Sequence, residues 1–307
     1  PIFIVLMFLF LLYSLNLDNA LTGVHTFLKL NLRKLFDLKV WIASFSLAAI
    51  SLGLSFGIMP AIARKSEKGF IAGNSYVIAV FELLISIAVG FILFGVLGFL
   101  SMKQAVGIDK LAFSDFGSEF TVLAQALPFF YKPTLLSILF FIFLSTFFIL
   151  GTASLAYSIT HILVHKFKTK HTNAAIIVAG LGFLFGLLFI IGPGFYIMDI
   201  VSHFVYYNIL IAILLEVLAV GWFFDSEKIS DFINHHSILK IGGLWRFFIR
   251  YFVPIIILLL LVIQVKRDFL LNYNNYPWLY VLIFGVGIVV IPLVIAFLMP
   301  RRILDKR

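Results

Sequence analysis

Two absences set the first limits on what this sequence can encode. None of the 307 residues is cysteine, and Asp, Glu, Lys and Arg together make up only 12% of them. The first absence excludes disulfide bonds and thiolate chemistry, although it leaves the redox compartment undetermined. The second is about half the charged fraction of an average soluble domain. The sequence also lacks a nucleophile elbow, a phosphate-binding loop and a metalloprotease motif, which argues against an enzyme.

What the sequence has instead is a large hydrophobic fraction, 63% of its residues. Apolar runs of about 20 residues recur, which is the length that a helix needs to cross the hydrocarbon core of a bilayer. Because backbone polar groups in lipid must be hydrogen-bonded within the protein, runs this apolar predict helices. The alternating strands of a membrane barrel are not visible. We therefore predict an all-α polytopic membrane protein embedded in the lipid bilayer.

Hydropathy predicts a single transmembrane domain with no linker inside it. The eight candidate spans cover about residues 2–17, 40–63, 76–101, 134–163, 173–191, 201–224, 246–265 and 278–299. In the long connection at 103–132, the stretch SEFTVLAQALPFF predicts a short helix on or in the membrane. The chain begins with Pro1, inside an apolar run that has no charged flank, so we expect it to be the C-terminal part of a longer protein.

The distribution of basic residues predicts the orientation in the membrane. With eight spans, both termini face the same side, and the connections on that side hold more Lys and Arg than those on the other. They include Arg64, Lys166, Lys240 and the tail from Arg301. Such connections stay in the cytoplasm, so we predict a cytoplasmic C-terminus in the plasma (inner) membrane. The net charge of +9 then reflects this basic face and does not indicate nucleic-acid binding.

The second span contains a stretch that weakens a helix. Residues 51–57, SLGLSFG, hold two glycines and two serines, and Pro60 follows. Gly lowers helix stability, Ser competes for backbone hydrogen bonds and Pro lacks a donor. A broken helix would free carbonyl and N–H groups to bind ions and polar groups near the middle of the membrane. Close helix packing through small residues explains the same pattern, so both interpretations stay open.

Other polar side chains within spans are candidates for function, because they are expensive to place in lipid. Glu82 and Ser86 lie one helical turn apart in the third span. This Glu binds a cation or a proton in one interpretation and has only a structural hydrogen bond in the other. Ser154 lies in the fourth span, Glu216 lies in the sixth, and Asp199 lies at the outer edge before the sixth.

Two histidine pairs are weaker candidates. His161 and His165 have the i, i+4 spacing of metal ligands, but HILVH lacks a third ligand and a catalytic Glu. A solvated helix end explains this pair better. His235 and His236 lie in a polar loop and predict no site.

Six stretches, taken in order, resemble the neurotransmitter:sodium symporter family, which includes the bacterial leucine transporter. They are VWIASFSLAAISLGLSFGIM, SIAVGFILFGVLGFL, ALPFF with FFILGTAS, GPGFYIMD, EVLAVGWFFDSEKISDFI and WRFFIRYFVP. The resemblance covers nearly the whole chain and makes the eight spans similar to family helices five to twelve. It implies an inverted-repeat, leucine-transporter-like fold, of which the chain holds the second repeat and two peripheral helices. The family's first four helices are then missing.

The resemblance also implies site residues. Ser51 matches a hydroxyl ligand of the family's first sodium site, and Ser154 matches a serine of the second. Substrate-pocket positions of the family match Ile50, Ser51, Gly53, Phe56 and Ser154, with Phe56 as an aromatic wall over the ligand.

Several positions depart from the family pattern. Glu82 stands where the family has an Asn ligand for the first sodium ion, and it could supply fixed negative charge or take a proton. Ser86 matches the chloride-binding serine, but Leu47 replaces a Gln of the chloride-dependent members. Ala153 stands where the second sodium site has a Thr or Asp. Asp199 matches the outer-gate acid, whose basic partner would lie in the missing first helix.

The function that the resemblance implies is sodium-coupled symport of an amino acid or related amine by alternating access. Na⁺ would be the coupled ion, and dependence on Cl⁻ is not expected. Whether the protein forms a homodimer is left open by the sequence. The alternative is a non-transporting sensor or assembly partner derived from the same fold, which the changes at Ala153 and in the third span favour.

Overall fold

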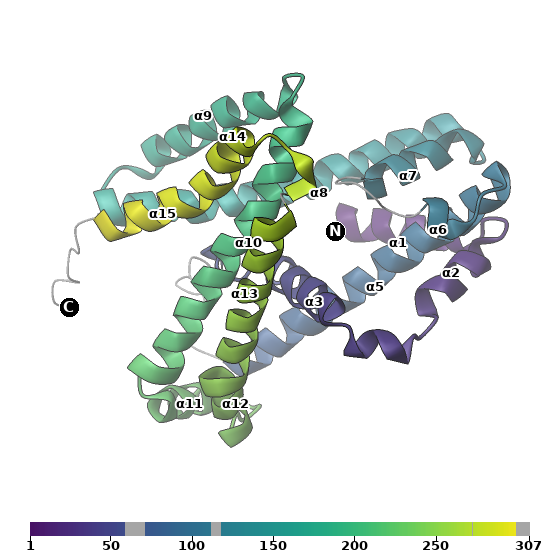
Figure 1. The fold of residues 1–307 in the computed structure, drawn as a ribbon. Coiled ribbons are helices and arrows are strands. Elements are labelled where there is room, and N and C mark those ends of the chain that lie inside the picture. Colours follow the sequence, from purple (N-terminus) through teal and green to yellow (C-terminus); the bar gives the residue numbers. More distant parts are fainter. Residues whose placement is uncertain (59–70, 112–117, 272, 299–307) are drawn as a thin grey trace. The chain divides into compact units, whose positions relative to one another are not determined.

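The computed structural model describes residues 1–58, 71–111, 118–271 and 273–298. Within these ranges the chain is helical, with turns between the helices and no strand (Figure 1). Pro60, Arg64 and Arg301, which contribute to the predicted break and orientation, lie outside the described residues.

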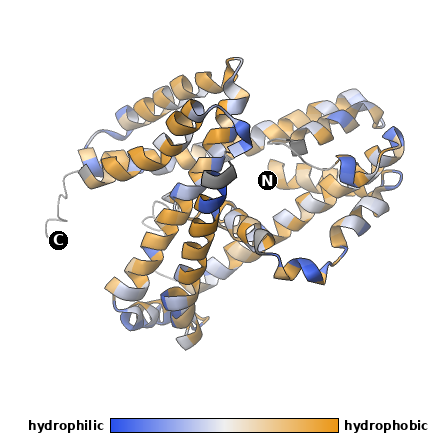
Figure 2. Ribbon diagram, viewed as in Figure 1, coloured by the Kyte–Doolittle hydropathy of each residue, from blue (hydrophilic) through white to orange (hydrophobic). Residues whose placement is uncertain are grey.

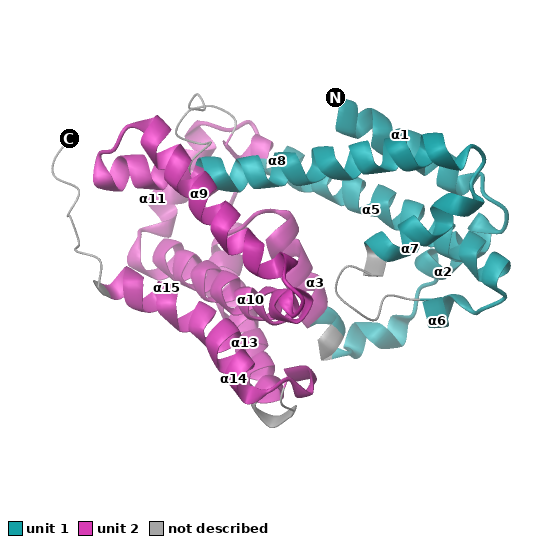
Figure 3. Cartoon of the chain, turned by 90° about the horizontal axis from the view of Figure 1, so that it is seen from above, with its two compact units in different colours: residues 1–41, 75–157 teal, residues 42–74, 158–307 magenta. Residues whose placement is uncertain are grey.

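The chain divides into two compact units, and each is described by itself (Figure 3). The first unit consists of residues 1–41 and 75–157, and the second of residues 42–74 and 158–307. The boundaries fall inside three helices, namely α3 (Leu38–Ser51), α5 (Ile71–Gln104) and α8 (Pro133–Phe167).

The first unit holds an apolar core built mainly from α1, α5 and α8. Helix α1 covers Ile2–Leu15, and the unit's other elements are α2 (Ala20–Leu28), η1 (Leu32–Phe36), α6 (Ile108–Leu111), α7 (Ser118–Ala126) and η2 (Leu127–Phe129). The most buried core side chains include Val96, Leu97 and Leu100. The short helix predicted within SEFTVLAQALPFF is present as α7 and η2.

A sharp bend in the first unit separates α1 from α2. The chain bends by 106° between the two helices, and Asn19 before α2 adopts a left-handed φ of 61°. The Asn19 side chain donates a hydrogen bond to the Gly98 carbonyl at 2.9 Å. A Cβ at Gly23 would lie 1.7 Å from the Phe94 carbonyl oxygen, so only glycine permits this approach of α2 to α5.

The second unit is organised around α10, which packs against α13. Ala49 near the end of α3 joins the same apolar cluster, together with Ile209, Leu210, Ile213, Ile257 and Leu260. The elements that follow α8 are α9 (His171–Ile190), α10 (Gly194–Leu218), η3 (Ala219–Phe223), α11 (Ser226–His235), α12 (Gly243–Phe247), η4 (Phe248–Phe252), α13 (Val253–Leu271), η5 (Tyr273–Asn275), α14 (Trp278–Tyr280), η6 (Val281–Val286) and α15 (Gly287–Leu298).

Six described helices are long and apolar enough to cross a membrane. They cover Ile71–Gln104, Pro133–Phe167, His171–Ile190, Gly194–Phe223, Gly243–Asn275 and Trp278–Phe297, and the bent α1–α2 pair gives up to seven. Hydrophobic residues run along these helices, and hydrophilic ones gather at their ends and connections (Figure 2). The predicted all-α polytopic membrane architecture is confirmed. The eight-span count and the missing first four helices remain predictions.

Candidate functional site

The end of α3 explains why the Ser/Gly stretch matters. The Gly53 N–H donates to the Ile50 carbonyl at 2.8 Å, and the Leu54 N–H donates to the Ala49 carbonyl at 3.0 Å. These two bonds form a Schellman motif, which ends a helix with its C′ residue in the left-handed region. Gly53 occupies that place with a φ of 64°. The helix therefore stops at Ser51, inside the predicted span.

The chain does not return to helical geometry directly after this stop. Ser55 and Gly57 also adopt left-handed φ angles, of 62° and 71°. Left-handed backbone is unusual for Ser, which marks Ser55 as a strained position. The segment from 52 to 57 consists of turns and bends, so its carbonyl and N–H groups are available outside the regular helical pattern.

Side chains from α8 and α10 contact this broken segment within the second unit. The fully buried Ser158 hydroxyl donates to the Phe56 carbonyl at 3.1 Å. A Cβ at Gly57 would lie 3.1 Å from the Ser158 Oγ, so the small residue permits the contact. The Ser55 hydroxyl donates to the Glu216 carboxylate over a long 3.3 Å. Sequence reasoning identified Ser55 and Glu216 separately, and it missed Ser158.

The predicted substrate-pocket residues divide into two kinds of environment. The side chains of Ile50 and Phe56 pack against the α10–α13 apolar cluster. Ser51 is exposed, and its hydroxyl donates to the Ala48 carbonyl at 3.3 Å. Gly53 has one neighbour within 4 Å of an added Cβ, the tip of Ile58 at 3.8 Å. The structure therefore gathers these four residues at the end of α3.

The remaining predicted ligands lie in the first unit. The Ser86 hydroxyl donates to the Glu82 carboxylate at 2.8 Å, which is the one-turn contact expected from the sequence. Ser154 is exposed, and its hydroxyl bonds to the Leu150 carbonyl of the same helix at 2.9 Å. Hydroxyl, carbonyl and carboxylate oxygens are ligands that a hard cation such as Na⁺ accepts. Among the described residues, no three His, Cys, Asp or Glu side chains gather as a metal site.

Asp199 lies inside α10, because this helix begins at Gly194 after the N-cap Pro193 and so starts before the predicted span at 201–224. Its carboxylate accepts hydrogen bonds from the Tyr273 hydroxyl at 3.1 Å, the Asn274 side chain at 3.2 Å and the Tyr276 hydroxyl at 2.9 Å. Burial, together with the bond to Asp199, raises the pKa of Tyr276, so this phenol stays protonated as a donor. Sequence reasoning did not find these donors.

A second polar cluster joins α10 to α13 nearby. The Asp268 carboxylate lies 2.6 Å from both the His203 Nε2 and the Tyr207 hydroxyl. His203 also stacks on Tyr273, with ring centroids 3.9 Å apart. Because His203 and Asp268 are 65 residues apart in sequence, no local pattern could have revealed the pair.

The sequence match to a known family covers both the end of α3 and these clusters. The family model for the sodium:neurotransmitter symporter family matches residues 2–304. The chain belongs to the sodium:neurotransmitter symporter family. The resemblance seen in the six stretches is therefore confirmed for this family member over nearly its whole length.

Individual relatives of this symporter-family chain agree with the family match. An uncharacterized sodium-dependent transporter of Methanocaldococcus jannaschii is 28% identical over 304 residues, which are 98% of this chain and 62% of the relative. A sodium-dependent dopamine transporter of Bos taurus is 26% identical over 280 residues, 89% of this chain and 40% of the relative. A sodium-dependent nutrient amino acid transporter of Drosophila willistoni is 26% identical over 281 residues, 88% of this chain and 43% of the relative.

These relatives are named as transporters and not as enzymes, in agreement with the absence of catalytic motifs. The chain spans less than two thirds of the length of each of the three.

Proposed function

We propose that the full-length protein is a sodium-coupled symporter of an amino acid or related amine that works by alternating access. The observation that carries the proposal is the stop of α3 at Ser51, followed by left-handed residues at 53, 55 and 57. Backbone polar groups released from a helix within the membrane can bind an ion and a polar substrate. A helix that only anchors a protein in the membrane has no use for such groups. Family membership supports the same conclusion.

In this proposal the end of α3 binds both the ion and the substrate. The Ser51 hydroxyl and freed carbonyls coordinate Na⁺, which is a cargo of the cycle. Gly53 leaves space beside the substrate, and Ile50 and Phe56 form its apolar boundary. Both already pack against α10 and α13 through the apolar cluster. Rocking of helices around this end would open the pocket to one side and then to the other.

The first-unit residues take supporting roles. Glu82 replaces a neutral sodium ligand and supplies the negative charge that chloride gives other members, with Ser86 holding it by the 2.8 Å bond. Ser154 is a further sodium ligand and substrate neighbour. Asp199 contributes to the outer gate. We also propose that the protein lies in the plasma membrane with its C-terminus in the cytoplasm, because of its basic residues.

The substrate class rests on the names of relatives. One is a dopamine transporter and another is a nutrient amino acid transporter, so an amine and an amino acid are both represented. Small amino acids and related amines are therefore the first substrates to test.

Uptake into proteoliposomes that contain the full-length gene product tests the function. We expect a radiolabelled substrate to accumulate only when sodium is higher outside. Glu82→Gln should abolish this accumulation or change its pH dependence, whereas Glu227→Gln should not. Unchanged uptake by Glu82→Gln at every pH would remove Glu82 from the mechanism. Sodium-dependent binding without accumulation would favour the non-transporting sensor, for which the changes at Glu82 and Ala153 are the supporting observation.

A further inference from the structure

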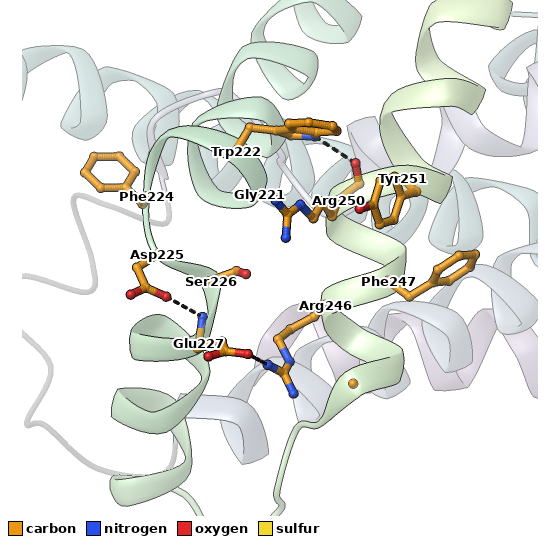
Figure 4. Close-up of a pocket in the computed structure, with 11 residues that line it drawn as sticks. Gly221, Trp222, Phe224, Asp225, Ser226, Glu227, Arg246, Phe247, Arg250 and Tyr251 are labelled. Atoms are coloured by element: carbon orange, nitrogen blue, oxygen red, sulfur yellow. Dashed lines mark hydrogen bonds and ion pairs between the residues drawn. The ribbon is translucent and has the colours of Figure 1, made fainter.

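Two π-helical turns face each other in the second unit, and a cavity lies beside them (Figure 4). One is η3, which follows α10, and the other is η4, which precedes α13. They approach closely at Gly221, where an added Cβ would lie 3.2 Å from the Arg250 Cα. Such turns are rare and occur disproportionately at functional sites. The cavity has a volume of about 440 Å³, and its lining includes Trp222, Ser226, Arg246, Arg250 and Tyr251.

Two acidic and two basic side chains line this cavity, and three of these four have a charged partner among the described residues. Glu227 pairs with Arg246. Asp225 caps α11 by accepting from the N–H groups of Glu227 and Lys228, and it lies 3.4 Å from the Lys228 ammonium. Arg250 has no carboxylate within ion-pair distance among the described residues. Its charge is therefore available to an anion from outside the protein.

Aromatic rings hold the Arg250 guanidinium in place. It lies 5.2 Å from the Trp222 ring and 5.8 Å from the Tyr251 ring. The Trp222 indole also donates to the Arg250 carbonyl at 2.9 Å, which ties the two π turns together. A guanidinium stacked on rings keeps its N–H edge free, and its planar fork matches two oxygens of a phosphate.

An exposed apolar stripe begins at the same cavity, on η4, and continues along α13. It consists of Tyr251, Ile255, Leu258, Leu259 and Val262, whose spacing places them on one helix face. The stripe runs along a helix that is long and apolar enough to cross the membrane. A ligand that fits both features has an anionic group at one end and a long apolar chain at the other. An anionic phospholipid of the surrounding leaflet has this chemistry, and basic pockets between membrane helices bind such headgroups.

We propose that this cavity binds the headgroup phosphate of an anionic phospholipid. Arg250 contacts the phosphate oxygens, the Ser226 hydroxyl at the cavity wall offers a further donor, and one acyl chain lies along the stripe on α13. The site is separate from the broken end of α3, and the proposal does not depend on transport activity.

Quenching of tryptophan fluorescence by brominated lipid tests the proposal on the full-length gene product in nanodiscs, with Trp222 beside the cavity and Trp41, Trp245 and Trp278 as a background common to the variants. One set carries bromine only on phosphatidylglycerol, and a matched set carries it only on the same fraction of phosphatidylcholine. We expect the association constant of the anionic lipid to be about fivefold that of the zwitterionic lipid. This ratio corresponds to the attraction between one arginine near the membrane surface and an anionic headgroup. Arg250→Gln should bring this ratio close to one, and Trp222→Phe should remove the quenching difference. The control Arg33→Gln should leave the ratio unchanged.

Three results would overturn the proposal. One is a ratio of one in the unaltered protein, which needs no variant to fold. Another is a ratio in Arg250→Gln equal to that of the unaltered protein. The third is Arg250-dependent binding of millimolar inorganic phosphate with no preference for the anionic lipid in phosphate-free buffer, because the cavity would then take free phosphate instead of a lipid headgroup.

Discussion

Two regions of the second unit depart from regular α-helix in opposite ways. At the end of α3 the helix stops, and left-handed residues follow at 53, 55 and 57. At η3 and η4 the helices widen by a π turn. The turn η3 lies at the end of α10, before α11, and the turn η4 continues into α13. The stop releases backbone polar groups, while the wide turns keep the backbone bonded and reposition side chains such as Trp222 and Arg250. Small polar ligands suit the first region, and side-chain recognition suits the second.

The strongest disruption of the wide turns should come from Gly221→Val. Its Cβ would approach backbone atoms of Ile249 and Arg250 to 3.2 Å, so the two helices must separate. We expect a loss of about 1–3 kcal/mol in the free energy of unfolding, typical of overpacking. Thermal unfolding in detergent micelles measures it. Gly180→Val, which has open space within 4 Å, is the control, and an equal loss there would show that the contact at Gly221 is unimportant.

The matching change at the stop is Gly57→Ala. Its φ of 71° disfavours any side chain, so we expect a loss of about 1–2 kcal/mol in the free energy of unfolding. Gly182→Ala in the middle of α9 should have the opposite sign, because Ala stabilises a helix interior by about 0.5–1 kcal/mol over Gly. Thermal unfolding of both variants compares the signs. The left-handed conformation at 57 would be refuted if both changes were stabilising.

A smaller effect is expected from Ser158→Ala, which removes the donor to the Phe56 carbonyl. The free energy of unfolding should fall by about 1 kcal/mol, because a partly buried acceptor loses its partner. Thr146→Ala in the same helix removes an exposed hydroxyl that bonds only to its own helix, and it should change stability little. Equal effects of the two substitutions would mean that the broken segment does not need Ser158.

The smallest effect concerns the α11 N-cap beside the wide turns. The hydrogen bond from the Lys228 N–H is the main cause that lowers the pKa of Asp225 from its ordinary 3.8. Because the folded pKa is the lower one, the cap is at full strength above pH 3.8 and is lost as the pH falls through the folded pKa. Hydrogen exchange at the Glu227 and Lys228 amides should therefore lose protection in acid. Asp225→Asn keeps a capping oxygen, so its protection should not vary with pH. Acid-dependent protection in that variant would assign the effect to another group.

The stop was predictable from sequence, and the wide turns were not. Gly and Ser at 51–57 have local preferences that weaken a helix wherever they occur, and α3 ends there. The π turns carry no such composition, because they depend on the approach of Gly221 to a helix about 30 residues further along the chain. Likewise, nothing local marks the bend at Asn19, which is held by the distant Gly98 carbonyl.

The candidate site shows the same division. The contact between Glu82 and Ser86 followed from one-turn spacing. The tyrosine and asparagine donors around Asp199 could not be predicted, because they come from a different helix end. Roles for Ile50, Gly53 and Phe56 came from the family resemblance, and they remain proposals.

The clusters at the two ends of the α10–α13 pair have a mechanical consequence. His203 meets Asp268 near one end, and Gly221 meets Arg250 near the other. His203 and Gly221 are 18 positions apart, which corresponds to about 27 Å of helix. Two attachments so far apart resist both sliding and rotation between the helices. We therefore expect α10 and α13 to move as one rigid body, with any shear taken up at other contacts.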